Sequence, residues 1–147
     1  MICLKDNMRY ERVLSKNYEF HYKDMGKYLQ QFMDEVKALG VHLNGPLFYT
    51  LNNVPFDERV KVEFFIPVKE EVDTKGDMKF HSYYSVENMM SMRILNNFEQ
   101  KTEEAYAAMI QLMNASEMNQ ITPPYHIIDR AGEYQFVTLK IGYMKKG

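Results

Sequence analysis

Few residues of the kinds that carry catalysis or bind metals occur in this sequence, and they are dispersed. The histidines are His21, His42, His81 and His126, and none has the spacing of a zinc motif such as H-E-x-x-H. Cys3 is the single cysteine, and the seven glycines form neither a phosphate-binding loop nor a G-x-S-x-G turn. The sequence therefore predicts no metal ion, no cofactor and no catalytic residue.

Two pairs of neighbouring acids are the remaining candidates for acid–base chemistry. They are Glu70 with Glu71 in a polar stretch, and Glu103 with Glu104 at the expected start of a helix. Side chains adjacent in a helix do not face the same point, so the second pair is a poor catalytic couple. We interpret both pairs as solvated surface groups.

Composition indicates a cytoplasmic domain with no affinity for nucleic acid. The chain has 147 residues, the length of one domain, and a net charge of −2, which gives no positive field for nucleic acid or an anionic membrane. A single cysteine excludes an internal disulfide and is typical of a reducing compartment. The N-terminal residues contain no apolar run long enough for a signal peptide, and no segment is apolar enough to span a bilayer.

Apolar spacing predicts one helix between residues 25 and 39. Asp24 is placed to begin it, and Gly40 is placed to end it in a left-handed conformation. The spacing is that of one helical face. The apolar positions are Tyr28, Leu29, Phe32, Met33, Val36 and Leu39.

A second helix, expected to begin at Thr102, repeats the first. Its apolar positions each lie 77 residues after one of the first helix: Ala105, Tyr106, Met109, Ile110 and Met113. Strand-forming segments follow both helices, and Pro46 matches Pro124 while Ile66 matches Ile141. The chain is therefore expected to be one domain, 1–147, made of two strand-helix-strand-strand halves at about 8–72 and 79–143, joined by the polar stretch 69–79.

Alternation in the last strand of each half predicts an apolar face and a mixed face. The apolar face should lie under the helices, and it comprises Val62, Phe64, Ile66 and Val68 with their repeats Val137, Leu139, Ile141 and Tyr143. The other face could be a ligand groove or the solvent-exposed side of an antiparallel sheet. It comprises Lys61, Glu63 and Phe65 with Phe136, Thr138 and Lys140.

The order of these segments resembles the GyrI-like domain, which is also the effector-binding module of some AraC-type and multidrug-sensing regulators. The resemblance rests on "GPLFYTL" and "VEFFIPV" in the first half and on "TPPYHII" and "FVTLKIGY" in the second. It implies an α+β fold of duplicated βαββ units, with a curved antiparallel sheet and two helices packed on one face. Because no helix-turn-helix segment precedes residue 8 or follows residue 143, we expect a stand-alone version.

The resemblance also implies a function, the binding of a small apolar or amphipathic molecule in an aromatic-lined cleft between the halves. Five residues would supply apolar walls, and a glutamate and a histidine would supply polar contacts. The seven candidates are Phe48, Tyr49, Glu63, Phe65, Tyr125, His126 and Phe136.

One residue departs from the multidrug-sensing relatives. These relatives carry a buried glutamate after the proline–aromatic pair of the second half, where this chain has His126. An imidazole cannot replace the attraction of a carboxylate for a cation. We therefore expect weak binding of cationic dyes, unless Glu63 of the first half supplies the acid.

Two other functions remain open. The fold could bind a protein partner as an accessory factor without catalysis, and an acidic stand-alone version is compatible with that role. A small hydrolase is a weaker alternative. Such relatives use a glutamate in the cleft, and this chain has His126 where that acid is expected. The oligomeric state is not predicted.

Overall fold

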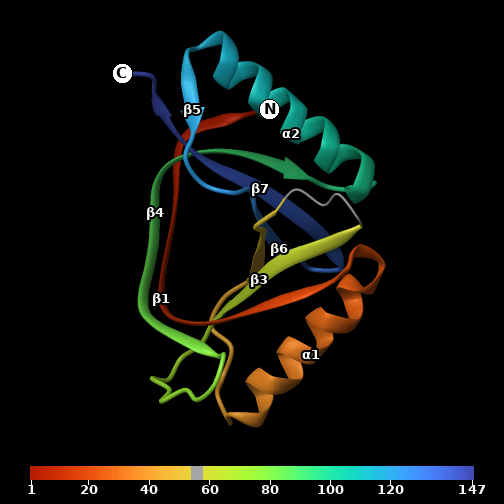
Figure 1. Cartoon of the computed structure of the whole chain (residues 1–147), viewed down its shortest axis with the longest axis vertical. Coiled ribbons are helices and arrows are strands. Elements are labelled where there is room, and N and C mark those ends of the chain that lie inside the picture. Colours follow the sequence, from red (N-terminus) through yellow and green to blue (C-terminus); the bar gives the residue numbers. More distant parts are fainter. Residues whose placement is uncertain (54–57) are drawn as a thin grey trace. The chain divides into compact units, whose positions relative to one another are not determined.

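The computed structural model describes residues 1–53 and 58–147, without the side chain at 131. These residues form the antiparallel strands and two α-helices of an α+β fold, as expected (Figure 1). Two compact units can be distinguished: an N-terminal unit, Arg9–Tyr84, and a C-terminal unit, Met1–Met8 with Ser85–Gly147. The elements are β1 (Cys3–His21), the 3-10 helix η1 (Tyr22–Asp24), α1 (Met25–Ala38), β2 (Leu47–Leu51), β3 (Arg59–Pro67), β4 (Lys79–Ile94), α2 (Phe98–Ala115), β5 (Met118–Gln120), β6 (Tyr125–Ala131) and β7 (Tyr134–Lys145).

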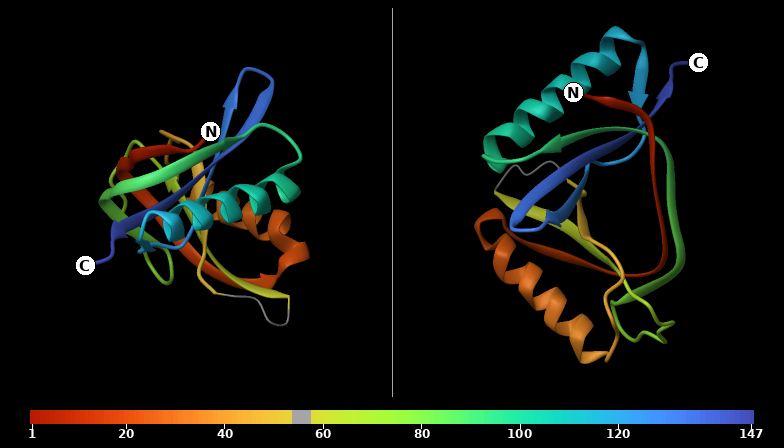
Figure 2. Two further views of the ribbon diagram at one scale, coloured as in Figure 1. Left: turned by 90° about the horizontal axis from the view of Figure 1, so that it is seen from above. Right: turned by 180° about the vertical axis from the view of Figure 1, so that it is seen from behind.

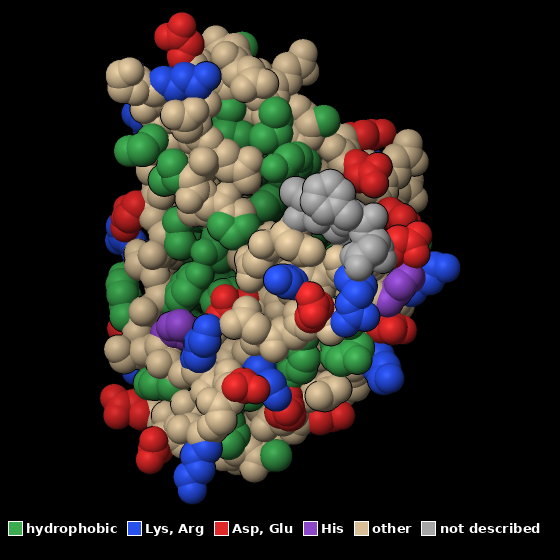
Figure 3. Space-filling view, viewed as in Figure 1, with side chains coloured by type: hydrophobic (Ala, Val, Ile, Leu, Met, Phe, Trp, Pro, Cys, Tyr) green, Lys and Arg blue, Asp and Glu red, His purple; other side chains and the backbone are tan. Residues whose placement is uncertain are grey.

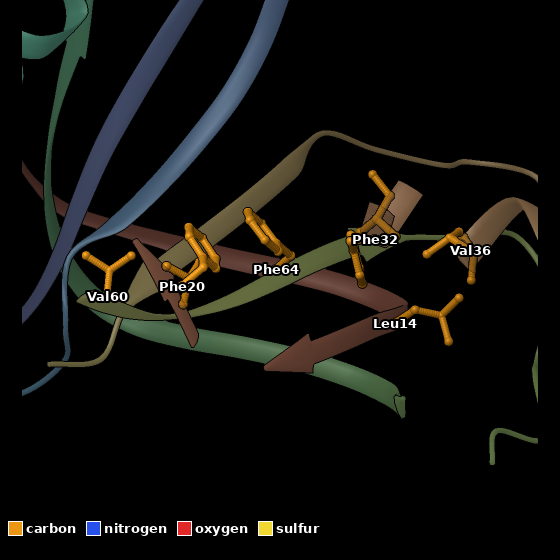
Figure 4. Packing of buried hydrophobic residues seen from close by; sticks show 9 residues of the cluster. Leu14, Phe20, Phe32, Val36, Val60 and Phe64 are labelled. Carbon is orange, nitrogen blue, oxygen red and sulfur yellow. The ribbon is translucent and has the colours of Figure 1, made fainter. Parts of the chain in front are cut away.

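In the N-terminal unit, β3 pairs with β1 on one side and with β2 on the other. The helix α1 covers one face of these strands, and its buried residues Phe32 and Val36 belong to the predicted apolar stripe. Phe32 stacks on Phe64 of β3 with 5.7 Å between ring centroids. Figure 4 shows these three side chains in one cluster with residues of β1. The apolar face predicted for β3 therefore does lie under a helix.

The C-terminal unit has the same plan around β7. This strand pairs with β4 and β6, and its end pairs with the short strand β5. The helix α2 runs beside β5 and β7 (Figure 2). Its residues Ala105, Met109 and Met113 are buried with Leu139 and Ile141 of β7, as the repeat predicts.

Strand register confirms the duplicated βαββ architecture. Leu14 of β1 lies opposite Ile66 of β3, and Met90 of β4 lies opposite Ile141 of β7. The predicted match of Ile66 with Ile141 is therefore confirmed. Strand β5 corresponds to a single β-bridge of the N-terminal unit, because the bridge between Leu43 and Val68 is the equivalent of the pair Gln120 and Tyr143.

Two details of the repeat were wrong. Tyr49 lies opposite Phe64, and His126 lies opposite Leu139, so Pro46 corresponds to the first proline of the Pro-Pro pair and not to the second. The second helix begins at residue 98, four residues before the predicted start. Phe98 lies seven residues before Ala105 and packs against the same cluster, but the six polar residues at 99–104 separate it from the predicted apolar stripe.

Gly142 of β7 lies in a closely packed part of the C-terminal unit. A Cβ atom at this position would lie 2.6 Å from Cγ2 of Thr122, whose Oγ1 accepts a hydrogen bond from the Gly142 N–H at 2.8 Å. We expect Gly142→Ala to lower the free energy of unfolding by about 1–3 kcal/mol, because the added methyl group overfills the site. Urea denaturation measures this loss.

Thr122→Ser provides the control, because it removes Cγ2 and keeps the Oγ1 acceptor. In that background, Gly142→Ala should cost less than half as much as in the original chain. Equal losses in both backgrounds would show that the Thr122 methyl group does not limit the site.

The surface carries charges of both signs. On the face that Figure 3 shows, lysine and arginine side chains are interspersed with aspartate and glutamate. This mixture agrees with the net charge of −2. Neither α-helix of the described residues is long and apolar enough to cross a membrane.

Candidate functional site

The N-terminal unit carries a cluster of aromatic rings on the face of its strands opposite α1. Phe48 of β2 and Phe65 of β3 are register partners and stack at 4.7 Å between centroids, with 7° between ring planes. Tyr84 of β4 lies 5.0 Å from Phe65, and Tyr10 of β1 stacks on Phe48 at 5.4 Å. The two phenylalanines are buried and the two tyrosines are half-buried. We call these four residues the aromatic face.

Alternation along β3 explains why these rings gather there. Phe64 and Phe65 are neighbours in a strand, so they point to opposite faces. Phe64 joins the core under α1, which leaves Phe65 to the other side. The apolar composition of that side shows that it is not simply a solvent-exposed polar face.

A hydrogen-bonded trio lies beside the aromatic face. The Ser15 hydroxyl donates to Oε2 of Glu63 at 2.8 Å, and Nε2 of His81 lies 2.9 Å from the same hydroxyl oxygen. A hydroxyl has one proton to donate, so His81 must be the donor to Ser15. Ser15 is the register partner of Phe65, and the His81 ring lies 6.3 Å from the Phe65 ring. The trio and the aromatic face are therefore one site.

Burial differs among the three polar residues. Ser15 is fully buried, whereas Glu63 and His81 are half-buried. Among the residues that the structure describes, no second hydrogen-bond partner of Glu63 is found, so its Oε1 can accept a bond from a ligand. Desolvation lowers the pKa of His81; the Glu63 charge opposes this shift and Lys79 adds to it. His81 is therefore neutral near pH 7.

The C-terminal unit has an ion pair where the N-terminal unit has Phe65. Ser91 lies opposite Lys140, as Ser15 lies opposite Phe65. The Ser91 hydroxyl donates to Oδ2 of Asp6 at 2.7 Å, and Nζ of Lys140 lies 3.2 Å from the same oxygen. Burial alone would raise the pKa of Asp6, but hydrogen bonds from Ser91 and Asn7 and the Lys140 charge lower it overall. In each unit, a serine at the equivalent position thus donates a hydrogen bond to a carboxylate.

Three of the seven predicted site residues come together in the N-terminal unit. Phe48 and Phe65 belong to the aromatic face, and Glu63 belongs to the trio. Tyr49 does not join them, because it lies opposite Phe64 and packs against the core under α1. Burial raises the pKa of Tyr49 to about 12.

The other three predicted residues belong to the C-terminal unit. Tyr125 lies opposite Lys140, and Phe136 carries the Arg93 guanidinium 4.6 Å above its ring, so both point away from α2. His126 lies opposite Leu139 on the side that α2 covers, and it is buried. His126 therefore does not share a strand face with Tyr125. The ligand-binding roles of all seven residues stay predictions.

Sequence reasoning missed Ser15, His81, Tyr10 and Tyr84. Each of them lies in β1 or β4, whereas the strand faces were predicted only for the last strand of each half. One signal was available: Ser15 and Ser91 occupy equivalent positions of the two halves. A hydroxyl at both positions, directly after the apolar pairs at 13–14 and 89–90, indicates a polar site.

A second polar cluster lies on the α1 side of the N-terminal unit. Nζ of Lys16 donates to Oε1 of Glu35 at 2.8 Å, and the Tyr18 hydroxyl donates to the other oxygen of this carboxylate. Burial is the largest cause that raises the pKa of Tyr18, and the hydrogen bond and charge of the Glu35 carboxylate raise it further. The cluster ties β1 to α1, which indicates a structural role. No group of three possible metal ligands occurs among the residues that the structure describes.

Residues 9–145 match the sequence profile of a family described as "Domain of unknown function (DUF5085)". The chain belongs to this family. No curated protein matches its sequence.

EcmrR contains a similar fold. In a cryo-EM structure of an EcmrR–DNA complex, the TM-score is 0.76 at 14% identity, over 99% of this chain and 58% of the EcmrR chain. The crystal structure of the EcmrR C-terminal domain gives 0.67 at 11% identity, over 96% of this chain and 97% of that domain. This chain therefore spans little more than half of the EcmrR chain.

Two further structures share the fold. A hydrolase from Listeria innocua has a TM-score of 0.60 at 11% identity, over 97% of this chain and 90% of the hydrolase. SAV2435 bound to tetraphenylphosphonium has a TM-score of 0.50 at 7% identity, over 96% of this chain and 92% of SAV2435. At such identities the likeness shows a common fold and nothing about activity.

Proposed function

We propose that this protein is a GyrI-like effector-binding domain that binds a small apolar or amphipathic organic molecule against the aromatic face. The observation that carries this proposal is the combination of stacked rings with a half-buried carboxylate. Binding sites for small molecules are typically apolar, with a few polar groups that orient the ligand. Phe48 and Phe65 form the apolar floor, and Tyr10 and Tyr84 provide half-buried rings against which a ligand can pack.

The similar structures support this proposal at the level of the fold. SAV2435 has been solved with tetraphenylphosphonium, so the fold is compatible with binding of an aromatic cation. EcmrR carries the fold as its C-terminal domain. The hydrolase is compatible with the fold too, but Ser15, the serine beside the aromatic face, is fully buried and donates to Glu63. We therefore propose binding without catalysis.

Glu63 is the acid that this proposal assigns to the site. Its carboxylate lies beside the rings, whereas His126 lies on the α2 side of β6. A carboxylate next to aromatic rings favours a ligand that combines apolar surface with positive charge. The expectation of weak cation binding depended on His126, and Glu63 offers the compensation that this expectation left open.

Tyr84→Ala tests the proposed function. Tetraphenylphosphonium is the probe, and isothermal titration calorimetry near pH 8 measures its Kd. We expect Tyr84→Ala to weaken binding roughly tenfold, because a stacking contact contributes about 1 kcal/mol beyond its buried area. The neighbouring Tyr83 provides a matched control, because it is 58% exposed, whereas Tyr84 is half-buried against Phe65.

Tyr83→Ala should leave the Kd unchanged. Equal effects of the two substitutions would place the ligand elsewhere. If neither tetraphenylphosphonium nor the neutral triphenylphosphine oxide binds, the aromatic face is not a small-molecule site, and the protein-partner alternative is favoured.

A further inference from the structure

We infer that Ser15 and His81 determine the charge preference of the proposed site: through Ser15, His81 positions the Glu63 carboxylate, and a protonated His81 cancels its charge. This inference rests on the proposed function. The site then prefers aromatic cations while His81 is neutral, and it loses this preference when His81 takes up a proton.

Geometry supplies the first argument. The trio joins three strands, because Ser15 lies in β1, Glu63 in β3 and His81 in β4. The hydrogen bonds run in one direction, from His81 to Ser15 and from Ser15 to Glu63. This arrangement occupies Oε2 of Glu63 and leaves Oε1 for a ligand.

Distance and burial supply the second argument. The Glu63 oxygen and the His81 nitrogen share one hydroxyl partner, at 2.8 and 2.9 Å, so they lie within about 6 Å of each other. Over this range, two charges strongly affect each other in a partly desolvated site. Ser15 is fully buried, so water does not compete for the link. A proton on His81 is therefore felt by Glu63 and by any cation bound to it.

The charged groups that act on His81 are Glu63 of β3 and Lys79 of its own strand. Desolvation, the largest cause, lowers the pKa of His81 from its ordinary value of 6.5, and Lys79 acts in the same direction. The imidazole therefore takes up its proton only below that value. Above it the pair of Glu63 and His81 carries one negative charge, and at lower pH the pair becomes neutral.

The C-terminal unit supplies an independent comparison. There the equivalent serine, Ser91, also holds a carboxylate, that of Asp6, but this acid is paired with Lys140. The carboxylate of that pair therefore already has a lysine as its cationic partner. The two halves thus use the same serine–carboxylate unit, with a fixed cation in one half and a titratable group in the other. This difference restricts a histidine partner of the serine–carboxylate unit to the N-terminal unit.

The experiment compares a permanent cation with a neutral molecule of similar shape. Calorimetry measures the Kd of tetraphenylphosphonium and of triphenylphosphine oxide at about pH 8 and at a lower pH at which nuclear magnetic resonance shows the His81 ring to be protonated. We expect the phosphonium to bind roughly tenfold more weakly at the lower pH and the phosphine oxide to bind equally at both. If both probes bind and neither depends on pH, this inference is wrong while the proposed function stands.

His81→Gln isolates the titrating group, because an amide N–H can still donate to Ser15 and takes up no proton. We expect this variant to bind the phosphonium equally at both pH values. A pH dependence that persists in the variant overturns the inference, since another group would then be responsible. Glu63→Gln should remove the preference for the phosphonium at both pH values.

Ser15→Ala tests the positioning role. We expect it to reduce the preference for the phosphonium over the phosphine oxide at about pH 8, and we expect Ser15→Thr, which keeps the hydroxyl, to restore it. Ser91→Ala removes the equivalent hydroxyl of the other half and should leave the preference unchanged. Thermal unfolding identifies any variant that fails to fold. A folded Ser15→Ala protein with unchanged preference would show that the hydroxyl does not position Glu63.

Discussion

Replacing Phe32 by alanine is expected to lower the free energy of unfolding by about 3–5 kcal/mol. The ring is fully buried between α1 and the strands of the N-terminal unit. It stacks on Phe64 and makes an edge contact with Tyr18, so truncation removes apolar burial and leaves a cavity between these rings. Urea denaturation followed by far-ultraviolet circular dichroism measures the change.

Gln31→Ala is the control for this experiment. Residue 31 is the neighbour of Phe32 in α1, and its side chain is exposed. Surface substitutions of this kind change stability by less than about 0.5 kcal/mol. A loss below about 1 kcal/mol for Phe32→Ala would mean that the apolar stripe of α1 faces solvent.

Met109→Ala should destabilise the protein by about 2–5 kcal/mol. Met109 is the repeat of Phe32 in α2, and it is fully buried with Leu139 and Ile141 of β7. Because each unit has its own cluster under its own helix, both truncations are expected to be costly. The same denaturation curves measure the second loss.

Met109→Leu distinguishes lost volume from lost chemistry. Leucine conserves most of the methionine volume, and such exchanges usually cost less than about 1.5 kcal/mol. If the alanine and leucine variants lose the same stability, the site does not depend on packing, and the equivalence of the two helices in the core is contradicted.

Local periodicity explains the part of the fold that could be predicted. The stripe of α1 repeats at helical spacing, and Phe32 and Val36 within it are buried. Alternation in β3 separates Phe64 from Phe65, and the core contains the first of them under α1. Both patterns arise from backbone geometry within a few residues, so a single segment is sufficient to express them.

The offset between the halves could not be predicted to the residue. A proline indicates where a strand begins, but it does not determine which residue of the neighbouring strand lies opposite the next position. A shift of one residue in the register between two strands moves every side chain to the opposite face of the sheet. Tyr49 and His126 were accordingly grouped with Phe48 and Tyr125, although the register places them on the helix side of their strands.

The sequence by itself determined the duplication, the two helices and the apolar face under each of them, because these features repeat at fixed spacing along the chain. Only the tertiary structure brought Ser15, Glu63 and His81 together. These residues lie on three strands, and each appears alone within its own segment as an ordinary polar residue. Hydrogen bonds need atoms within about 3 Å in a defined direction. Strand pairing sets that geometry between distant segments, and no local pattern records it.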